Sequence, residues 1–420
     1  MKLSHPKPST YKIISLWLLL LSVLFSLCAC ADASDIAPQS DAPNSVSLLS
    51  HWACHTGVMT HTPTLPAPIQ GVSARSAVLV RADTGEVLFE QNAKVKLPMA
   101  STTKIMTALV AVDTLPLDTL VTIPAQAVGV EGSSIYLIEG EVLSLESLLY
   151  GLLLSSANDA AVAIALTCAP SVEDCAALMN QKAQDLGLKD THFVNPHGLD
   201  DPDHYTTALD LAQLASVAVM HPVLCGIMST QKTTIPLHGE EGVRWLVNHN
   251  KLLSSYDGAV GVKTGYTKKS GRCLVSAAQR DELTLVAVTL NAPDDWRDHT
   301  AMLDYGFSLY DTIELCQAGA YAQPLSVVGG TQDYVMVKNT QGLTLPIHKG
   351  YGDIVCQVEI PRFVYAKVTQ GQLMGYMVYT TTLPDGTQVT LGRVPLYAGY
   401  SVEPISYKQN LGQWLKSLFT

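Results

Sequence analysis

Three short clusters of polar residues stand in an order that could carry out acyl transfer without a histidine. They are Ser101-Thr102-Thr103-Lys104, Ser156-Ala157-Asn158 and Lys263-Thr264-Gly265. The first places a hydroxyl one helical turn from an amine that could accept its proton. The second adds a hydroxyl and a carboxamide, and the third adds a cation beside a glycine that permits close backbone approach. In this order the trio indicates a serine enzyme that cleaves an amide.

Ser101 is the predicted nucleophile and Lys104 its base. At the start of a helix the backbone N–H of Ser101 would make no intrahelical hydrogen bond and would favour a developing oxyanion. Lys104 can accept a proton only if its pKa falls, and burial together with the charge of Lys263 would lower that pKa. An isolated Ser-x-x-Lys indicates little, because an N-cap serine followed by a surface lysine is the simpler interpretation. The pattern also recurs at Ser9 to Lys12 and at Ser229 to Lys232.

The second cluster follows a strongly apolar segment, where a helix cap would be the simplest role for its polar residues. The functional interpretation makes Ser156 a relay that carries the proton toward the leaving amine. Asn158 would hold both Lys104 and the substrate carbonyl in place. The cluster therefore extends the predicted catalytic set to Ser101, Lys104 and Ser156.

The third cluster lies in a segment that has the pattern of a strand. Lys263 and Thr264 would bind a carboxylate at the end of the substrate, a task that suits the compact charge of lysine. Gly265 would let the strand approach the acyl group, and the Tyr266 N–H would complete the oxyanion hole with that of Ser101. If Lys263 stood alone, a strand-edge lysine that deters aggregation would be the better interpretation.

Helices and strands that could position these clusters can be read from the apolar pattern. A hairpin is predicted at residues 77–80 and 87–89, around the turn Asp83-Thr84-Gly85. Buried helices are predicted at 101–115, 143–154 and 159–166, with 155–158 as a turn. Strands are predicted at 260–265, 273–278 and 283–291. The pattern predicts one antiparallel sheet built from both ends of an α/β domain, with helices on both sides, over residues 73–310.

The N-terminus indicates export. Three lysines precede the apolar run Ile13 to Leu27, which is short for a membrane span and suits a signal peptide at residues 1–31. Two interpretations stay open: cleavage after the small-x-small Ala29-Cys30-Ala31, or lipidation of Cys30. Residues 32–72 are rich in Ser, Pro, Ala and Thr and are predicted to be a flexible linker. We expect the protein outside the cytoplasm, at the cell wall or the outer face of the cytoplasmic membrane.

The C-terminal part changes character near Tyr310. Short β-type runs separated by turn residues predict a small all-β sandwich domain at 311–404. Residues 405–420 carry apolar side chains at helical spacing. An amphipathic tail on a membrane surface and a helix packed on the β domain both stay open for them.

Composition excludes several classes of function. The chain has 420 residues and a net charge of -11 without a long basic run, so nucleic acid is not an expected partner. Seven cysteines remain beyond the signal, and Cys168 with Cys175 is the local candidate for a disulfide. The group His51, Cys54, His55 and His61 lacks zinc spacing, so no metal and no cofactor are expected.

The trio and its surroundings resemble the serine-type D-alanyl-D-alanine carboxypeptidases, the low-molecular-mass penicillin-binding proteins of peptidase family S11. The likeness rests on the trio, on Gly261 to Thr267 followed by Ser270 to Val275, and on the segments 193–200 and 206–212. It implies a β-lactamase/transpeptidase-like domain that removes the terminal D-alanine from the peptidoglycan pentapeptide through a Ser101 acyl-enzyme. It also implies β-lactam antibiotics as covalent inhibitors. Ala157 stands where many relatives have glycine, and His197 in Asn-Pro-His-Gly is expected to shape a loop.

Three rival functions are considered. A class A β-lactamase would need a Glu-x-x-x-Asn motif between the second and third clusters, but Glu173, Glu240 and Glu241 are followed four residues later by Ala177, Arg244 and Trp245. Rapid β-lactam hydrolysis is therefore not expected. A non-catalytic wall-binding scaffold would not need a nucleophile beside a base. An endopeptidase that cuts cross-links would not need a free terminal carboxylate at the same distance.

Overall fold

The structure is a computed structural model that describes residues 52–53, 56–60, 64–237 and 242–406. The described residues divide into two compact units: 64–237 and 242–313 with 344–352, and 52–53 and 56–60 with 314–343 and 353–406. The predicted signal peptide, Cys30 and residues 407–420 of the predicted tail lie outside the described residues. The units are described separately below, beginning with the one that contains the three clusters.

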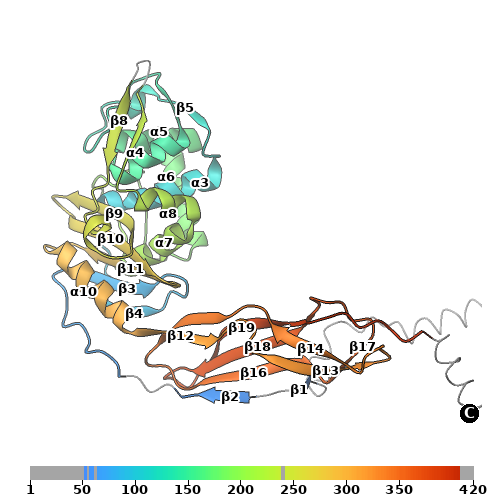
Figure 1. The fold of residues 1–420 in the computed structure, drawn as a ribbon. Coiled ribbons are helices and arrows are strands. Elements are labelled where there is room, and N and C mark those ends of the chain that lie inside the picture. The colour runs from blue at the N-terminus through green and yellow to red at the C-terminus, as the bar shows by residue number, and fades with distance from the viewer. Residues whose placement is uncertain (1–51, 54–55, 61–63, 238–241, 407–420) are drawn as a thin grey trace, which may run out of the picture. The chain divides into compact units, whose positions relative to one another are not determined.

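The first unit is built on a five-stranded antiparallel sheet in the order β4-β3-β11-β10-β9 (Figure 1). Its strands are β3 (Ser76–Arg81), β4 (Val87–Gln91), β9 (Ala259–Thr267), β10 (Gly271–Arg280) and β11 (Leu283–Leu290). The N-terminal hairpin joins the C-terminal strands where β3 pairs with β11, in a register that sets Val78 against Val288. This confirms the prediction of one sheet built from both ends of the domain.

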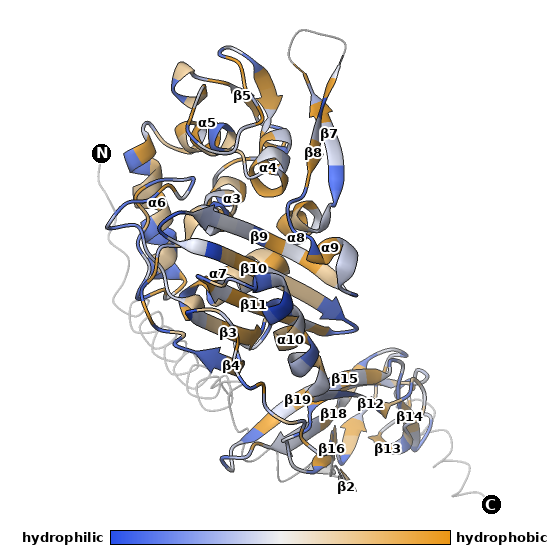
Figure 2. Cartoon of the chain, turned by 90° about the vertical axis from the view of Figure 1, so that its left-hand side faces the viewer, coloured by the Kyte–Doolittle hydropathy of each residue, from blue (hydrophilic) through white to orange (hydrophobic). Residues whose placement is uncertain are grey.

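Helices cover both faces of this sheet. One face packs on the cluster of apolar side chains contributed by α3 (Lys104–Thr114), α4 (Leu145–Leu154), α5 (Asn158–Cys168), α6 (Val172–Asp185), α7 (Ala208–Met220) and α8 (Pro222–Ser229). The other face packs on α10 (Asp295–Ser308), and the short α9 (Leu252–Ser255) adds Leu252 to that second core. The interior strands β10 and β11 are coloured largely as apolar in Figure 2, as two covered faces require.

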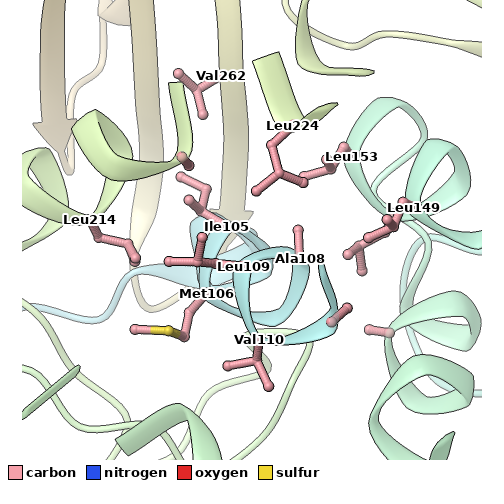
Figure 3. Packing of buried hydrophobic residues seen from close by; sticks show 14 of the residues in the cluster. Ile105, Met106, Ala108, Leu109, Val110, Leu149, Leu153, Leu214, Leu224 and Val262 are labelled. Atoms are coloured by element: carbon pink, nitrogen blue, oxygen red, sulfur yellow. The ribbon is translucent and has the colours of Figure 1, made fainter. Parts of the chain in front are cut away.

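Helix α3 lies at the centre of the larger core. Ile105, Met106, Leu109 and Val110 point in different directions from it, and labelled side chains of α4, α7, α8 and β9 lie around the helix (Figure 3). Such a helix has no solvent-facing stripe, so its polar N-terminal residues are held among packed neighbours. The predicted helix 101–115 in fact begins as a 3-10 turn, η1 (Ala100–Thr103), before α3 continues it.

Three smaller elements flank this core. Strands β5 (Leu120–Thr122) and β6 (Val142–Ser144) form a short ladder, with η2 (Ala125–Ala127) between them. The strand β6 takes the first residues of the predicted helix 143–154, because Ser144 caps α4 by accepting a hydrogen bond from the Ser147 N–H. Strands β7 (Lys232–Pro236) and β8 (Val243–Val247) form a second hairpin.

The second unit is all-β, as predicted. Its eight-stranded sheet contains β1 (Trp52–Ala53), β2 (Thr56–Met59), β13 (Ala322–Val328), β14 (Tyr334–Asn339), β16 (Ile354–Pro361), β17 (Phe363–Tyr365), β18 (Leu373–Thr382) and β19 (Gln388–Ala398). Outside this sheet, β12 (Tyr310–Cys316) and β15 (Leu343–His348) form a separate two-stranded sheet that is not confined to the second unit, since residues 344–348 belong to the first.

Two boundaries differ from the sequence prediction. Residues 52–53 and 56–59, predicted to belong to a flexible linker, pair with β16, because their backbone N–H and C=O groups find partners along that strand. Residues 344–352, predicted within 311–404, belong to the first unit. There Lys349 pairs with Asp311, and the Tyr351 hydroxyl approaches Glu86.

Two further observations bear on the sequence analysis. Cys168 and Cys175 are not joined by a disulfide; both are thiols, and burial raises their pKa values to about 11 and about 12. Among the described residues no single helix is long and apolar enough to cross a membrane, although the bent pairs α5 with α6 and α7 with α8 pass by length and composition alone.

Candidate active site

The predicted nucleophile and base lie within hydrogen-bonding distance. Lys104 Nζ is 2.9 Å from Ser101 Oγ, because the two residues stand one turn apart where η1 passes into α3. Ala100, directly before the serine, has a φ of 48°, a left-handed conformation that is uncommon for a residue with a side chain. This strained residue sets the direction in which η1 (Ala100–Thr103), the nucleophile turn, enters α3.

Lys104 is fully buried, and two oxygens besides that of Ser101 surround its amine. Lys104 Nζ donates to Asn158 Oδ1 and to the His197 carbonyl, each at 2.7 Å. Burial and the nearby charge of Lys263 hold the pKa of Lys104 well below its usual range, against the opposing charge of Asp159. A neutral amine has a lone pair, so it can accept the Ser101 proton.

Lys263 is the second buried lysine of the site. Its side chain is 1% exposed, and Nζ donates to the Thr264 carbonyl at 2.9 Å. Burial lowers the pKa of Lys263 to about 7. Lys263 therefore changes charge near neutral pH, and its proton state acts on Lys104.

The Ser156 turn is held by the backbone on both sides. Ser156 itself has a φ of 58°, and Ala157 is the N-cap of α5, so Asn158 begins that helix. The Asn158 N–H donates to the Ser133 carbonyl at 2.7 Å, and its side-chain amide donates to the Glu131 carbonyl. Because Asn158 is tied at both groups, its Oδ1 stays directed at Lys104.

Asp159, which sequence reasoning did not single out, anchors the segment that contains Ser133. Its carboxylate accepts from the Ser134 hydroxyl at 2.6 Å and from the backbone N–H groups of Ile135 and Leu137 at 3.1 Å. The carboxylate is buried, and these donors satisfy its oxygens. The start of α5 thus supplies both the Asn158 carboxamide that contacts Lys104 and the Asp159 carboxylate that fixes the facing loop.

Gly265 brings β9 against the nucleophile turn. A Cβ built on Gly265 would lie 3.0 Å from the Ser101 nitrogen and 3.1 Å from the Met99 oxygen, so a larger residue would require these backbone atoms to shift by a few tenths of an ångström. The backbone of β9 can therefore approach Ser101 closely enough for the Tyr266 N–H and the Ser101 N–H to face one acyl oxygen. The Tyr266 side chain is 67% exposed, so the predicted role falls to its backbone.

The predicted site residues meet at one cleft of about 490 Å³. Its lining contains Ser101, Ser133, Ser156, His249, Thr264, Gly265, Tyr266, Arg272, Cys273, Asp295 and Trp296. Of the eight residues predicted from the sequence, five line the cleft, while Lys104, Asn158 and Lys263 are buried behind them. The structure brings all eight into one site.

The loop at residues 195–199 supports Lys104 through its backbone. The Asn195 side chain accepts from the Gly198 N–H at 2.7 Å and donates to the Leu199 carbonyl at 3.0 Å, and this arrangement presents the His197 carbonyl to Lys104. His197 shapes this loop as expected, since its Nδ1 accepts from the Leu199 N–H. The contact made by its carbonyl could not be read from the sequence, because any residue type supplies one.

Gly198 provides a test of how closely this loop must approach the nucleophile turn. Its φ is 90°, and a Cβ there would lie 2.0 Å from the Ala100 oxygen. We expect Gly198→Ala to displace the Ser101 turn and to slow labelling by a fluorescent penicillin about 100-fold, the usual cost of a displacement of roughly 1 Å in an active site. Gly129→Ala is the matched control, because Gly129 also has a positive φ, of 73°, but nothing lies within 4 Å. Equal labelling rates for the two variants would contradict the argument.

A buried histidine supports the nucleophile turn from below. The Val194 N–H donates to His204 Nδ1 at 3.0 Å, so the proton of the neutral ring is on Nε2, which donates to Thr103 Oγ1 at 2.7 Å. Burial lowers the pKa of His204 to about 4, and the ring is therefore neutral at physiological pH. Thr103 in turn donates to the Ala100 carbonyl at 2.7 Å. The chain of hydrogen bonds fixes the turn without touching substrate.

Arg272 is a cation of the cleft that sequence reasoning missed. Its guanidinium donates to Asp295 at 2.6 Å and lies 6.0 Å from the centre of the Trp296 ring. The Arg272 side chain is 45% exposed, whereas that of Asp295 is 5% exposed. The hydrogen bond to Asp295 raises the pKa of Arg272, so this charge is permanent. The sequence does not indicate a role for Arg272, because its partner Asp295 is 23 positions away and comes close only when the chain folds.

Comparison with known proteins agrees with this site. The family model described as D-alanyl-D-alanine carboxypeptidase, Peptidase_S11, matches residues 60–294. The D-alanyl-D-alanine carboxypeptidase DacF of Bacillus subtilis is 31% identical over 357 residues, which cover 82% of this chain and 90% of that protein. The crystal structure of D-alanyl-D-alanine carboxypeptidase DacD from Francisella tularensis aligns with a TM-score of 0.57 at 25% identity, over 87% of this chain and 100% of that one. Penicillin-binding protein 5 from Haemophilus influenzae aligns with a TM-score of 0.57 at 26% identity, over 80% of this chain and 100% of that one.

Proposed function

Because the chain belongs to the peptidase S11 family of D-alanyl-D-alanine carboxypeptidases, we propose that it removes the terminal D-alanine from peptidoglycan stem peptides by a serine mechanism. Ser101 is the nucleophile of this mechanism and Lys104 its general base. The observation that supports the proposal best is the buried Lys104 amine, 2.9 Å from Ser101 Oγ and with a strongly lowered pKa. No structural role requires a neutral amine at that position.

Acylation begins when Lys104 Nζ takes the proton of Ser101 Oγ and the oxygen attacks the carbonyl between the two D-alanines. The charge that develops on the carbonyl oxygen is stabilised by the N–H groups of Ser101 and Tyr266. Ser156 lines the cleft; its hydroxyl gives a proton to the leaving amine and receives in turn the proton held by Lys104. Breakdown then releases D-alanine and leaves the shortened peptide as an ester on Ser101.

Water completes the reaction by attacking this ester. The same pair acts in reverse order: Lys104 takes a proton from water and returns one to Ser101. A β-lactam would acylate Ser101 in the same way, but its leaving amine stays attached to the ring product. The missing Glu-x-x-x-Asn motif supports slow release of that adduct and therefore penicillin binding rather than β-lactamase activity.

Two cations can serve the terminal carboxylate of the substrate. Thr264 lines the cleft beside the buried Lys263, which supports the clamp inferred from the sequence. Lys263, however, donates to the Thr264 carbonyl and has a pKa of about 7, so its charge is incomplete at neutral pH. Arg272 keeps its charge and opens onto the same cleft, and a guanidinium can pair with a carboxylate through two donors. We assign the permanent part of the clamp to Arg272.

Replacing Arg272 tests this assignment. We expect Arg272→Gln to lower kcat/KM for a peptide that ends in free D-Ala-D-Ala by about 10- to 100-fold, since one charge-assisted pair is lost. The C-terminal amide of the same peptide lacks the carboxylate, so its slower cleavage should change less than threefold. Arg297→Gln is the control, because Arg297 is an arginine of α10 whose side chain is 76% exposed. If Arg272→Gln lowered kcat/KM equally for the free-acid peptide and for its C-terminal amide, Arg272 would support the fold and would not bind the substrate carboxylate.

The function itself is tested by incubating the protein with a pentapeptide that ends in D-Ala-D-Ala and measuring free D-alanine. We expect one D-alanine per peptide and a tetrapeptide as the only other product. Release of D-alanyl-D-alanine, or none at all, would overturn the proposal. We further propose that the chain acts outside the cytoplasm, where this substrate occurs; the apolar run at residues 13–27 supports export.

A further inference from the structure

A buried ion pair joins two segments that border the cleft. Both carboxylate oxygens of Glu141 accept from the guanidinium of Arg244, one of them at 2.8 Å. The Glu141 side chain is 0% exposed and that of Arg244 is 9% exposed, so the pair is shielded from water. Glu141 ends the loop that contains Ser133, whereas Arg244 lies on β8, in the hairpin that leads to His249. Figures 1 and 2 both show this hairpin beside α4.

Further hydrogen bonds connect Arg244 and Glu141 to backbone groups of the loop and of the hairpin. Arg244 also donates to the Tyr136 carbonyl and to the Pro236 carbonyl, each at 3.2 Å. The second oxygen of Glu141 also accepts from the Ile138 N–H at 3.1 Å. The pair therefore fixes the backbone of the loop and of the hairpin, and a bidentate geometry of this kind leaves little freedom of rotation.

Both segments reach the cleft beside the Ser156 turn. On one side, the Ser133 carbonyl accepts from the Asn158 N–H at 2.7 Å, just after this turn. On the other side, the His249 N–H donates to the carbonyl of Leu154, the last residue of α4 before the turn, at 3.3 Å. Ser133 and His249 both line the cleft. Ser156 and Thr264 line the same cleft, and we define Ser133 and His249 as the two walls of its end beside the Ser156 turn.

In the proposed reaction this end receives the leaving residue, because Ser156 protonates its amine and the clamp at Thr264 holds its carboxylate. The side chain of that residue must then fit between the walls. We propose that the Glu141–Arg244 pair, by fixing the distance between the Ser133 wall and the His249 wall, limits the leaving residue to one with a small side chain. The inference rests on the proposed function and adds to it a basis for specificity. Both residues act through others and are positioning residues.

The test compares two peptides that differ only in the last residue, D-alanine or D-leucine. Both keep a free carboxylate at the same distance, so the clamp is unchanged and only the side chain between the walls differs. The variant is Glu141→Gln with Arg244→Gln, because removing both charges avoids leaving one buried charge unpaired. We expect the ratio of kcat/KM for D-alanine over D-leucine to fall about tenfold or more from its wild-type value, which is the scale of discrimination that pocket size gives.

Two further variants keep the result decisive. Arg244→Lys retains the charge pair with a single-point contact, and we expect it to lower the same ratio about threefold even if the double variant does not fold. Arg81→Gln with Asp83→Asn removes another arginine–carboxylate pair, in the β3–β4 hairpin, and should leave the ratio unchanged. A wild-type ratio in both Arg244 variants, with D-alanine still released, would overturn the inference and leave the proposed function intact. Absence of D-alanine release by the wild type would overturn the proposed function, and the inference with it.

Discussion

Ser101→Ala is expected to abolish release of D-alanine from the pentapeptide. Removal of the nucleophile of a serine hydrolase lowers kcat by about 10⁴- to 10⁶-fold. Among the described residues Ser101 supplies the hydroxyl that is hydrogen-bonded to Lys104 Nζ, whose other partners are Asn158 Oδ1 and the His197 carbonyl. Ser156 lines the same cleft but is not one of these partners. The measurement is a D-alanine assay over hours at high enzyme concentration.

Binding should survive this substitution. The proposed clamp of Arg272, Thr264 and Lys263 does not involve the Ser101 hydroxyl, so Ser101→Ala should bind the intact pentapeptide with a Kd within about threefold of the wild-type KM measured under the same conditions. Ser133→Ala is the matched control, since Ser133 also lines the cleft and interacts with Asn158 through its backbone. Activity of Ser101→Ala above about one per cent of the wild type would place the nucleophile elsewhere.

Lys104 gives the second large effect. We expect Lys104→Met and Lys104→Arg each to lower the acylation rate by about 10²- to 10⁴-fold, the usual contribution of a general base. Methionine removes the amine, whereas arginine keeps a donor and a positive charge but cannot lose its proton. If the residue served only as a cation, Lys104→Arg would retain activity, and that result would contradict the role of base. The rate is measured with a fluorescent penicillin under single-turnover conditions.

The same account fixes the sign of the pH dependence. Lys104 must be neutral, so the rate should rise as pH increases through the lowered pKa of its amine. Lys263 assists while it is protonated, so the rate should decline again as pH increases past its pKa of about 7. Lys263→Arg keeps a charge at every working pH and should remove the alkaline decline. A rate that only increases up to pH 10, as for a lysine of ordinary pKa, would contradict this assignment.

The fold could be predicted from the sequence where local patterns decide it. The hairpin around Gly85 and the three C-terminal strands were predicted because their apolar alternation and turn residues are local properties. The boundaries were less accurate. The strand β6 takes the first residues of the predicted helix 143–154. These residues pair with β5, and Ser144 caps α4, so the helix begins later than the apolar pattern predicts. The strands at residues 52–59 lie in a Thr/Pro-rich stretch with no alternation, so only the partner strand β16 reveals them.

The site shows the same limit. All eight predicted residues meet at one cleft, because the trio consists of side chains whose chemistry the sequence displays. The missed contributions come from backbone groups and from pairs formed across the fold. The His197 carbonyl that contacts Lys104 is of the first kind. Arg272 with Asp295, and Glu141 with Arg244, are of the second kind, because a pairing between residues 23 or 103 positions apart leaves no local pattern.

The identity of the nucleophile is the central claim, and one measurement tests it directly. The purified chain is incubated with a penicillin, its intact mass is recorded, and the modified residue is located by peptide mapping. We expect one adduct per molecule, stable for minutes or longer, on Ser101 in the wild type and absent from Ser101→Ala. An adduct that persists in Ser101→Ala, or one that maps to another residue, would contradict the account.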